Sequence, residues 1–242
     1  MKRFAAIVLL LPSLVWAQDD EPPKPWTTSI GAGLALTSGN RETDSLNVSF
    51  STEYDFKTVH VFKSEILYLR GSVDGERTVD RSAASARYER TIRQRAFGFG
   101  ETTYLRDPFR NLTYSVSPVA GVGYHLVRTD SAQLTLDGAF GVTVERDDVR
   151  GRRQYRTWKG GEMFEWSLSP ATKLTQKLTA LWNRQDFGDA LYQLESALAT
   201  TLAGSLELKV SYRYDHKTRP PLATLKKGDS ALFAALVYKV SR

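Results

Sequence analysis

The chain has 242 residues, which is enough for one large β domain or two small ones. It contains no cysteine, so disulfides and thiolate metal sites are excluded. Its mean hydropathy of −0.35 is too polar for a bundle of membrane helices, and its formal net charge of +6 indicates only a weak preference for anionic partners.

The N-terminus has the features of a secretory signal peptide. Lys2 and Arg3 precede a short apolar run and a cleavage site that ends at Ala17. We therefore predict that residues 1–17 are removed on export and that residues 18–25, which are polar and proline-rich, form a flexible periplasmic lead-in. A lipid anchor is not expected, because no cysteine stands at the cleavage point.

Apolar and polar residues alternate in most segments after residue 26. In SLELKVSYRYD, residues 205–215, apolar side chains occupy every second position and polar ones stand between them. This is the period of a β-strand, whose successive side chains point to opposite faces. The same alternation recurs in residues 45–56, 112–126, 133–145 and 173–183. It is weaker in RSAASARYERTI (81–92), around Phe97 and Phe99, and around Trp158 and Trp166.

Two kinds of break separate these segments, and they alternate along the chain. Tight breaks occur near Lys57, Gln94, Asp130, Pro170 and Gly204. Longer, charged breaks are SGNRET, GSVDGERTVD, RDPFRN, RDDVRGRRQ, RQDFGDA and KTRPPLATLKKGD. The pattern predicts an all-β fold over residues 26–242, a transmembrane antiparallel up-and-down β-barrel of about 12 strands with short periplasmic turns and longer extracellular loops. The alternative is a soluble β domain, whose strands are usually shorter.

In a membrane barrel the apolar face of each strand contacts lipid and the other face lines the lumen. The residues expected in the lumen are charged: Glu53, Asp55, Lys63, Glu65, Arg87, Glu89, Glu207, Lys209, Arg213 and Asp215. A lumen of mixed charge fits either a narrow polar channel for small solutes or a closed network of ion pairs.

Basic residues are frequent in the predicted outside loops. They form an expected anion-binding rim: Arg146, Arg150, Arg152, Arg153, Arg156, Arg219, Lys226 and Lys227. Because guanidinium groups suit phosphates, we expect contact with outer-membrane lipid and lipopolysaccharide. Attraction of anionic solutes to a pore mouth and simple solubility are the alternatives. Nucleic acid is not an expected partner, since these residues would face the cell exterior.

Catalytic and metal-binding patterns are weak. His216 stands beside Asp215 and opposite Ser230, which makes it the one candidate base for an outer-leaflet hydrolase, but no Gly-x-Ser-x-Gly motif is present. His60 and His125 lie elsewhere, and three scattered histidines give no ligand spacing. We therefore expect a non-enzyme with no cofactor and no metal.

Two stretches resemble a known family. LALTSGNRETDS (34–45) and SYRYDHKTRPPLATLKKGDSALFAALVYKV (211–240) are similar to the signature and the closing hairpin of the salt-induced outer membrane proteins, bacterial barrels filed under a domain of unknown function. The resemblance covers residues 26–242 and implies fold and an outer-membrane location; no activity is established for the family, so it assigns no catalytic residues. We further expect a monomer that is inserted by the outer-membrane barrel assembly machinery. It would be a small-solute channel or, alternatively, a structural or envelope-stress barrel with a filled lumen.

Overall fold

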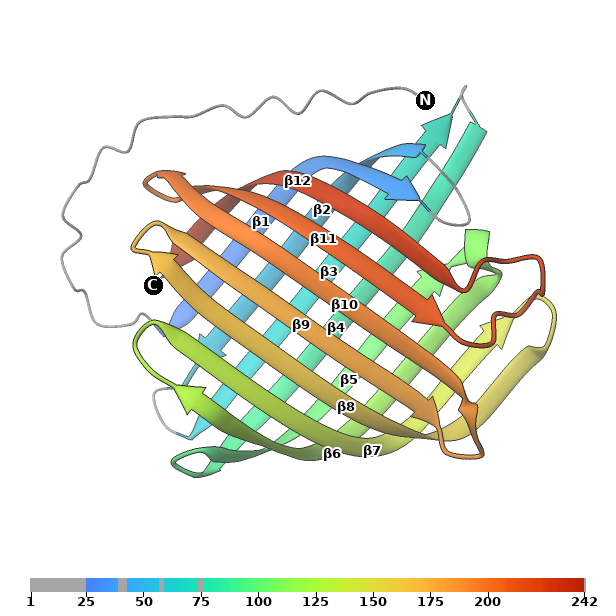
Figure 1. Cartoon of the computed structure of the whole chain (residues 1–242), viewed down its shortest axis with the longest axis horizontal. Helices are drawn as coiled ribbons and strands as arrows, with labels where there is room; N and C mark the ends of the chain where they lie inside the picture. The colour runs from blue at the N-terminus through green and yellow to red at the C-terminus, as the bar shows by residue number, and fades with distance from the viewer. Residues whose placement is uncertain (1–24, 39–42, 57–58, 74–75, 242) are drawn as a thin grey trace.

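The computed structural model describes residues 25–38, 43–56, 59–73 and 76–241, and these form a closed antiparallel barrel (Figure 1). The predicted signal peptide and nearly all of the lead-in lie outside the described residues. The strands are β1 (Trp26–Ser38), β2 (Thr43–Asp55), β3 (His60–Val73), β4 (Glu76–Arg93), β5 (Ala96–Asp107), β6 (Leu112–Arg128), β7 (Ala132–Asp147), β8 (Gly151–Ser169), β9 (Thr172–Asn183), β10 (Asp186–Ala203), β11 (Leu206–Lys217) and β12 (Gly228–Ser241). A short 3-10 helix, η1 (Pro108–Arg110), follows β5. No helix in the described ranges is long and apolar enough to cross a membrane.

Closure comes from the pairing of the first strand with the last. β1 and β12 pair without a register shift from Thr27 opposite Ser241 to Ser38 opposite Ser230. Every other strand pairs with its two neighbours in sequence. The sheet therefore has no open edge, and its backbone N–H and C=O groups are satisfied within the protein, as a membrane interior requires. The predicted fold class and strand number are confirmed.

The connections lie at two ends of the barrel. We call the end with the β2–β3, β4–β5, β6–β7, β8–β9 and β10–β11 connections the turn end, and the opposite end the loop end. Several segments predicted as loops are partly strand, since β3 continues to Val73 and β4 begins at Glu76. Paired strands satisfy each other's backbone groups even where the side chains are charged, so these hairpins extend into the polar segments. Residues 218–227 form a longer connection between β11 and β12.

The outer face of the barrel is apolar. Ile66 is 50% exposed, Leu236 53% and Val122 64%, on three different parts of the sheet. On β11 the apolar residues Leu208 and Val210 are on this outer face, as the alternation predicts. Such a continuous apolar surface around a closed sheet suits acyl chains and would be costly in water.

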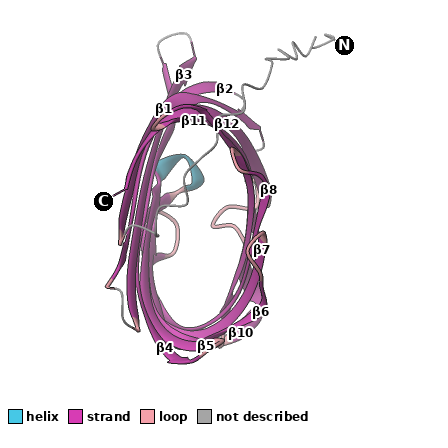
Figure 2. Cartoon of the chain, turned by 90° about the vertical axis from the view of Figure 1, so that its left-hand side faces the viewer, coloured by secondary structure: helices cyan, strands magenta, loops and turns pink. Residues whose placement is uncertain are grey.

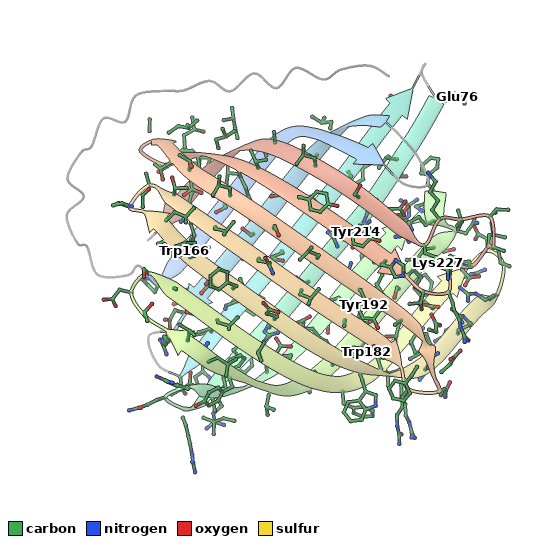
Figure 3. All side chains as sticks on the ribbon, viewed as in Figure 1. Glu76, Trp166, Trp182, Tyr192, Tyr214 and Lys227 are labelled. Carbon is green, nitrogen blue, oxygen red and sulfur yellow. The ribbon has the colours of Figure 1, made fainter. Side chains whose placement is uncertain are left out.

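Aromatic side chains flank the apolar band at both ends. Toward the turn end, the rings of Trp26, Tyr54 and Phe56 contact one another in sequence, with centroid distances of 6.4 and 4.6 Å. Toward the loop end, the Nε1–H of Trp182 donates to the Tyr192 hydroxyl at 3.1 Å. Figure 3 shows Trp182 and Tyr192 toward the loop end and Trp166 toward the turn end. Two such girdles are typical of barrels at membrane–water interfaces.

The barrel is oval in cross-section, with its long axis vertical in Figure 2. The β12–β1 and β6–β7 pairs lie at the two ends of the long axis, because they are half the barrel apart and occupy the top and bottom of Figure 1. Glycines stand at both ends: a Cβ on Gly33 would lie 2.0 Å from the Ala234 carbonyl oxygen, and one on Gly121 would lie 2.1 Å from the Gly138 carbonyl oxygen. These glycines permit the close backbone approach that tight bending needs.

Charge on the outer face should destabilise the barrel. We predict that Val210→Arg lowers the free energy of unfolding in lipid vesicles by about 2–4 kcal/mol, because an arginine in the middle of the lipid-facing band must leave water. Reversible urea unfolding followed by tryptophan fluorescence measures the change, with Val210→Leu as control. An arginine variant as stable as the leucine variant would contradict the assigned face.

The bending glycines give a second prediction. Gly33→Ala should lower the free energy of unfolding by about 1–3 kcal/mol, because its Cβ would overlap backbone that cannot move independently. Gly138→Ala is the matched control, since nothing lies within 4 Å of a Cβ built there. The folded fraction on an unheated gel compares the two variants, and equal stability would show that the barrel does not bend at Gly33.

Candidate functional site in the barrel lumen

The inward face of the barrel encloses a polar cavity of about 660 Å³. It extends from Thr27 and Lys239 near the turn end to Ser115 and Ser117 on β6. Hydroxyl groups are frequent among its lining residues, including Ser49 and Thr103. Among the described residues, seven basic and six acidic side chains line it: Lys63, Lys159, Lys173, Lys177, Lys209, Arg213, Lys239, Glu53, Glu65, Glu101, Glu165, Glu195 and Glu207. The cavity is therefore nearly neutral overall, with both charges distributed along it.

The residues predicted for the lumen occupy three kinds of position. Six line the cavity: Glu53, Lys63, Glu65, Glu207, Lys209 and Arg213. Arg87, Glu89 and Asp215 are held in ion pairs on the inward face. Asp55 lies at the turn end of β2, is exposed, and donates its backbone N–H to the Pro25 carbonyl oxygen at 2.7 Å.

A cluster of charged and aromatic side chains occupies the lumen on the β4–β8 side. Arg87 donates to Glu101 at 2.7 Å and to Asp137 at 3.0 Å. Lys159 on β8 donates to the same Glu101 oxygen at 2.7 Å. The Arg87 guanidinium carbon lies 3.7 Å from the ring centre of Phe99, within the range of a cation–π interaction. The contacts of Arg87 with Asp137 and of Lys159 with Glu101 connect strands that do not pair with each other, so they fix the shape of this part of the lumen.

The two flat walls of the oval, β2–β5 and β8–β11, are close enough for side chains to meet across the lumen. Lys177 on β9 forms an ion pair with Glu65 on β3 at 3.5 Å, although these strands are diametrically opposite in the sheet. Both side chains remain about half exposed, at 44% and 61%. The pair therefore bridges a solvent-accessible space rather than a dry core.

A tighter ion pair crosses the lumen nearer the loop end. Arg81 Nη2 on β4 lies 2.6 Å from Asp215 Oδ2 on β11, and the two residues are 9% and 2% exposed. Asp107 lies 3.8 Å from Arg81, and Arg213 lies 3.4 Å from Asp215. Because buried charges are costly unless paired, the balanced set holds these side chains in place and narrows the lumen.

The helix η1 lies within the outline of the barrel in Figure 2. Arg110 at its end forms an ion pair with Asp229 on β12 at 3.0 Å. Asn111 adopts the left-handed conformation (φ 56°) and donates its backbone N–H to the Pro108 carbonyl oxygen at 2.9 Å. Asparagine tolerates this conformation better than most residues, so the chain can turn back into β6 directly after η1.

A second cavity of about 80 Å³ lies toward the loop end and has room for a few water molecules. Its lining includes Glu145, Asp147 and Asp189, and each of these carboxylates has a basic or hydroxyl partner. The Tyr155 hydroxyl donates to Glu145 at 2.9 Å, and Lys217 lies 2.6 Å from Asp189. The two cavities share five lining residues: Leu105, Ser115, Ser117, Leu181 and Leu191.

The eight residues predicted for an anion-binding rim do not form one surface. Arg150 pairs with Asp147, Arg153 with Glu145, and Arg219 with Asp186. Three others are exposed on the outer face of β7 and β8: Arg146, Arg152 and Arg156. Lys226 and Lys227 lie in the 218–227 connection.

The histidine considered for hydrolysis does not meet a carboxylate. His216 is on the outer face of β11, where its contacts are with the rings of Tyr192 and Tyr214. The adjacent Asp215 points into the lumen and pairs with Arg81, because neighbouring strand residues face opposite sides. The described residues contain no group of three or more side chains suited to holding a metal ion.

Sequence reasoning missed several residues at the centre of the lumen. Arg81, Glu101, Asp137 and Lys159 carry the ion-pair clusters but were not among the predicted lumen residues. Arg81, Glu101 and Lys159 are in or near the segments where the alternation of apolar and polar residues is weak. In those segments small or aromatic residues face the lumen beside the charged ones. For Lys159 a signal was available, because it follows Trp158, an outward-facing residue of the same strand.

Solved structures with similar folds include three barrels of low sequence identity. The NanC porin is 7% identical, has a TM-score of 0.60, and the match covers 87% of this chain and 100% of that chain. An outer membrane channel from Pseudomonas putida F1 is 11% identical, with a TM-score of 0.54 and coverages of 93% and 100%. The translocator domain of the autotransporter NalP from Neisseria meningitidis is 10% identical, with a TM-score of 0.54 and 90% of each chain covered. At these identities the similarity shows the fold alone.

A search of curated proteins finds no match for the chain. A family described as a protein of unknown function, DUF481, matches residues 30–240. That description includes no response to salt, so the salt-induced name carried by the sequence resemblance stays a prediction. Since the match covers most of the barrel, the chain belongs to the DUF481 family.

Proposed function

We propose that the protein is an outer-membrane channel for small polar solutes. The closed sheet, the apolar outer band and the two aromatic girdles support placement in a membrane. The sequence features of a signal peptide support export. In the usual plan of such barrels, short turns face the periplasm, so the turn end would be periplasmic and the loop end extracellular.

The observation that carries the proposal is the polar cavity of about 660 Å³. It continues into the loop-end cavity through shared lining residues, two of which are the serines Ser115 and Ser117. Hydroxyl and charged groups along this route can replace the hydration of a small solute. The ion pair of Arg81 with Asp215 crosses the lumen near the loop end, so we expect the channel to exclude large solutes.

A structural barrel with a filled lumen is the second candidate. It is favoured by the same cross-lumen contacts near the loop end, because Arg81–Asp215 connects the two flat walls and Arg110–Asp229 connects η1 to β12. In that case the ion pairs would serve to hold the oval shape, and the cavity below them would be a closed vestibule. Conductance separates the two functions.

Removing the ion pair of Arg81 with Asp215 should widen the channel. We predict that the double variant Arg81→Ala, Asp215→Ala increases single-channel conductance at least about twofold, because two side chains that cross the lumen are removed. Both partners are removed together, since removing one would leave a buried charge without its partner. Planar-bilayer recording measures the effect.

The control for this experiment is Arg77→Ala, which removes an exposed arginine that pairs with Asp80 away from this ion pair. It should conduct as the unmodified protein does. If neither the unmodified protein nor the double variant conducts at any salt concentration, the channel proposal is wrong and the filled barrel is favoured.

The charge balance of the cavity predicts weak ion selectivity. The permeability ratio of K⁺ to Cl⁻ should be about 1, and Lys209→Glu should shift it toward K⁺ because an acidic group replaces a basic one along the route. The reversal potential in a salt gradient measures both values. Lys227→Glu in the 218–227 connection is the control; an equal shift in this control would place the selectivity outside the lumen.

A further inference from the structure

Four exposed arginines lie together on the outer surface of β7–β9 at the loop end. Arg146 on β7 is directly opposite Arg152 on β8. Arg156 is on the same outward-facing row of β8, nearer the middle of the barrel. Arg184 follows β9, and its backbone N–H donates to the Arg156 carbonyl oxygen at 2.8 Å. We call these four residues the outer arginine patch.

The patch lacks protein counterions. Within the described ranges of the chain, no carboxylate forms an ion pair with any of the four guanidinium groups. The surrounding arginines differ, since Arg150 lies 3.0 Å from Asp147. On the opposite wall, Arg77 and Arg106 share Asp80, at 3.4 and 3.2 Å.

This arrangement is unfavourable unless an anion is present. The Cβ atoms of directly opposite residues on neighbouring strands lie about 4.5–5.5 Å apart, and like charges in such a pair destabilise a sheet. Arg146 and Arg152 form such a pair. An external anion between them would convert repulsion into charge-assisted hydrogen bonds.

The position of the patch relative to the aromatic girdle indicates which kind of anion binds there. Trp158 is exposed on β8, and its ring lies 5.3 Å from that of Phe140 on β7. Arg156 is two residues nearer the loop end than Trp158, which is about 7 Å along a strand. Since interfacial tryptophans lie at the level of lipid headgroups, the patch begins at that level and extends outward from it.

We propose that the outer arginine patch binds the phosphate groups of lipopolysaccharide in the outer leaflet. Guanidinium groups bind phosphate with two parallel hydrogen bonds, and a row of them spans more than one phosphate. Tyr114, opposite Arg146 on β6, offers an aromatic side chain beside the site. The site is on the lipid side of the barrel wall, so it goes beyond the channel proposal and does not depend on conduction.

The test uses the full barrel purified in detergent and titrated with lipid A, with bound lipid counted by native mass spectrometry. The variant Arg146→Gln, Arg152→Gln, Arg156→Gln, Arg184→Gln should bind lipid A at least tenfold more weakly. The single variant Arg152→Gln should give a smaller loss in the same direction. A matched control replaces four exposed arginines at the turn end with glutamine: Arg90, Arg93, Arg95 and Arg128. This control should bind lipid A as the unmodified barrel does.

Several outcomes would overturn the proposal. They are unchanged lipid A binding by the fourfold patch variant, an equal loss in the turn-end control, and binding of inorganic phosphate as tight as that of lipid A, which would indicate a site for free anions. Bilayer conductance of the fourfold variant should remain unchanged. Loss of lipid binding with retained conductance would support the patch independently of the channel.

Discussion

The pairing of β1 with β12 is the constraint on which the rest of the structure depends. Without it the sheet would have two edges of unpaired backbone groups, which cannot remain in hydrocarbon. With it, each strand has one face toward lipid and one toward the lumen. The two-residue period of β11, with Val210 outside and Ser211 inside, follows from strand geometry, and closure assigns one face to lipid and the other to the lumen. A shift of one residue in any strand would expose its charged face to acyl chains.

Closure of the barrel does not determine the shape of its cross-section. Two features of the chain determine that shape. Glycines such as Gly33 and Gly121 allow the sheet to bend tightly at the two ends of the long axis of the oval. The flat walls then approach each other, so that Lys177 meets Glu65 and Arg81 meets Asp215. A circular barrel of the same strand number would keep these side chains apart. Both ion pairs follow from the flattening. The Arg81–Asp215 pair also stabilises it, because separating these two side chains would leave buried charges without partners.

Most of the fold could be predicted from the sequence, because a membrane barrel depends on a local pattern. The alternation around Leu206 and Val210 predicts both the strand and its two faces. The lumen was harder to predict, since contacts such as Arg81 with Asp215 join strands that are far apart in sequence and meet only because the cross-section is oval. The contacts of the basic residues predicted for the rim were harder still to predict. Arg152 and Arg153 are adjacent in sequence, yet Arg152 faces outward and Arg153 pairs with Glu145.

The central claim is that successive side chains of each strand alternate between the water-filled lumen and the surrounding lipid. Because the chain has no cysteine, single cysteines can be introduced without background. Barrels reconstituted in vesicles and carrying Lys209→Cys or Val210→Cys would be treated with a small, charged, membrane-impermeant thiol reagent. The account predicts rapid labelling of the Lys209→Cys variant and none of the Val210→Cys variant, which only a lipid-soluble reagent should reach. Equal labelling of both variants, or the reverse pattern, would contradict it.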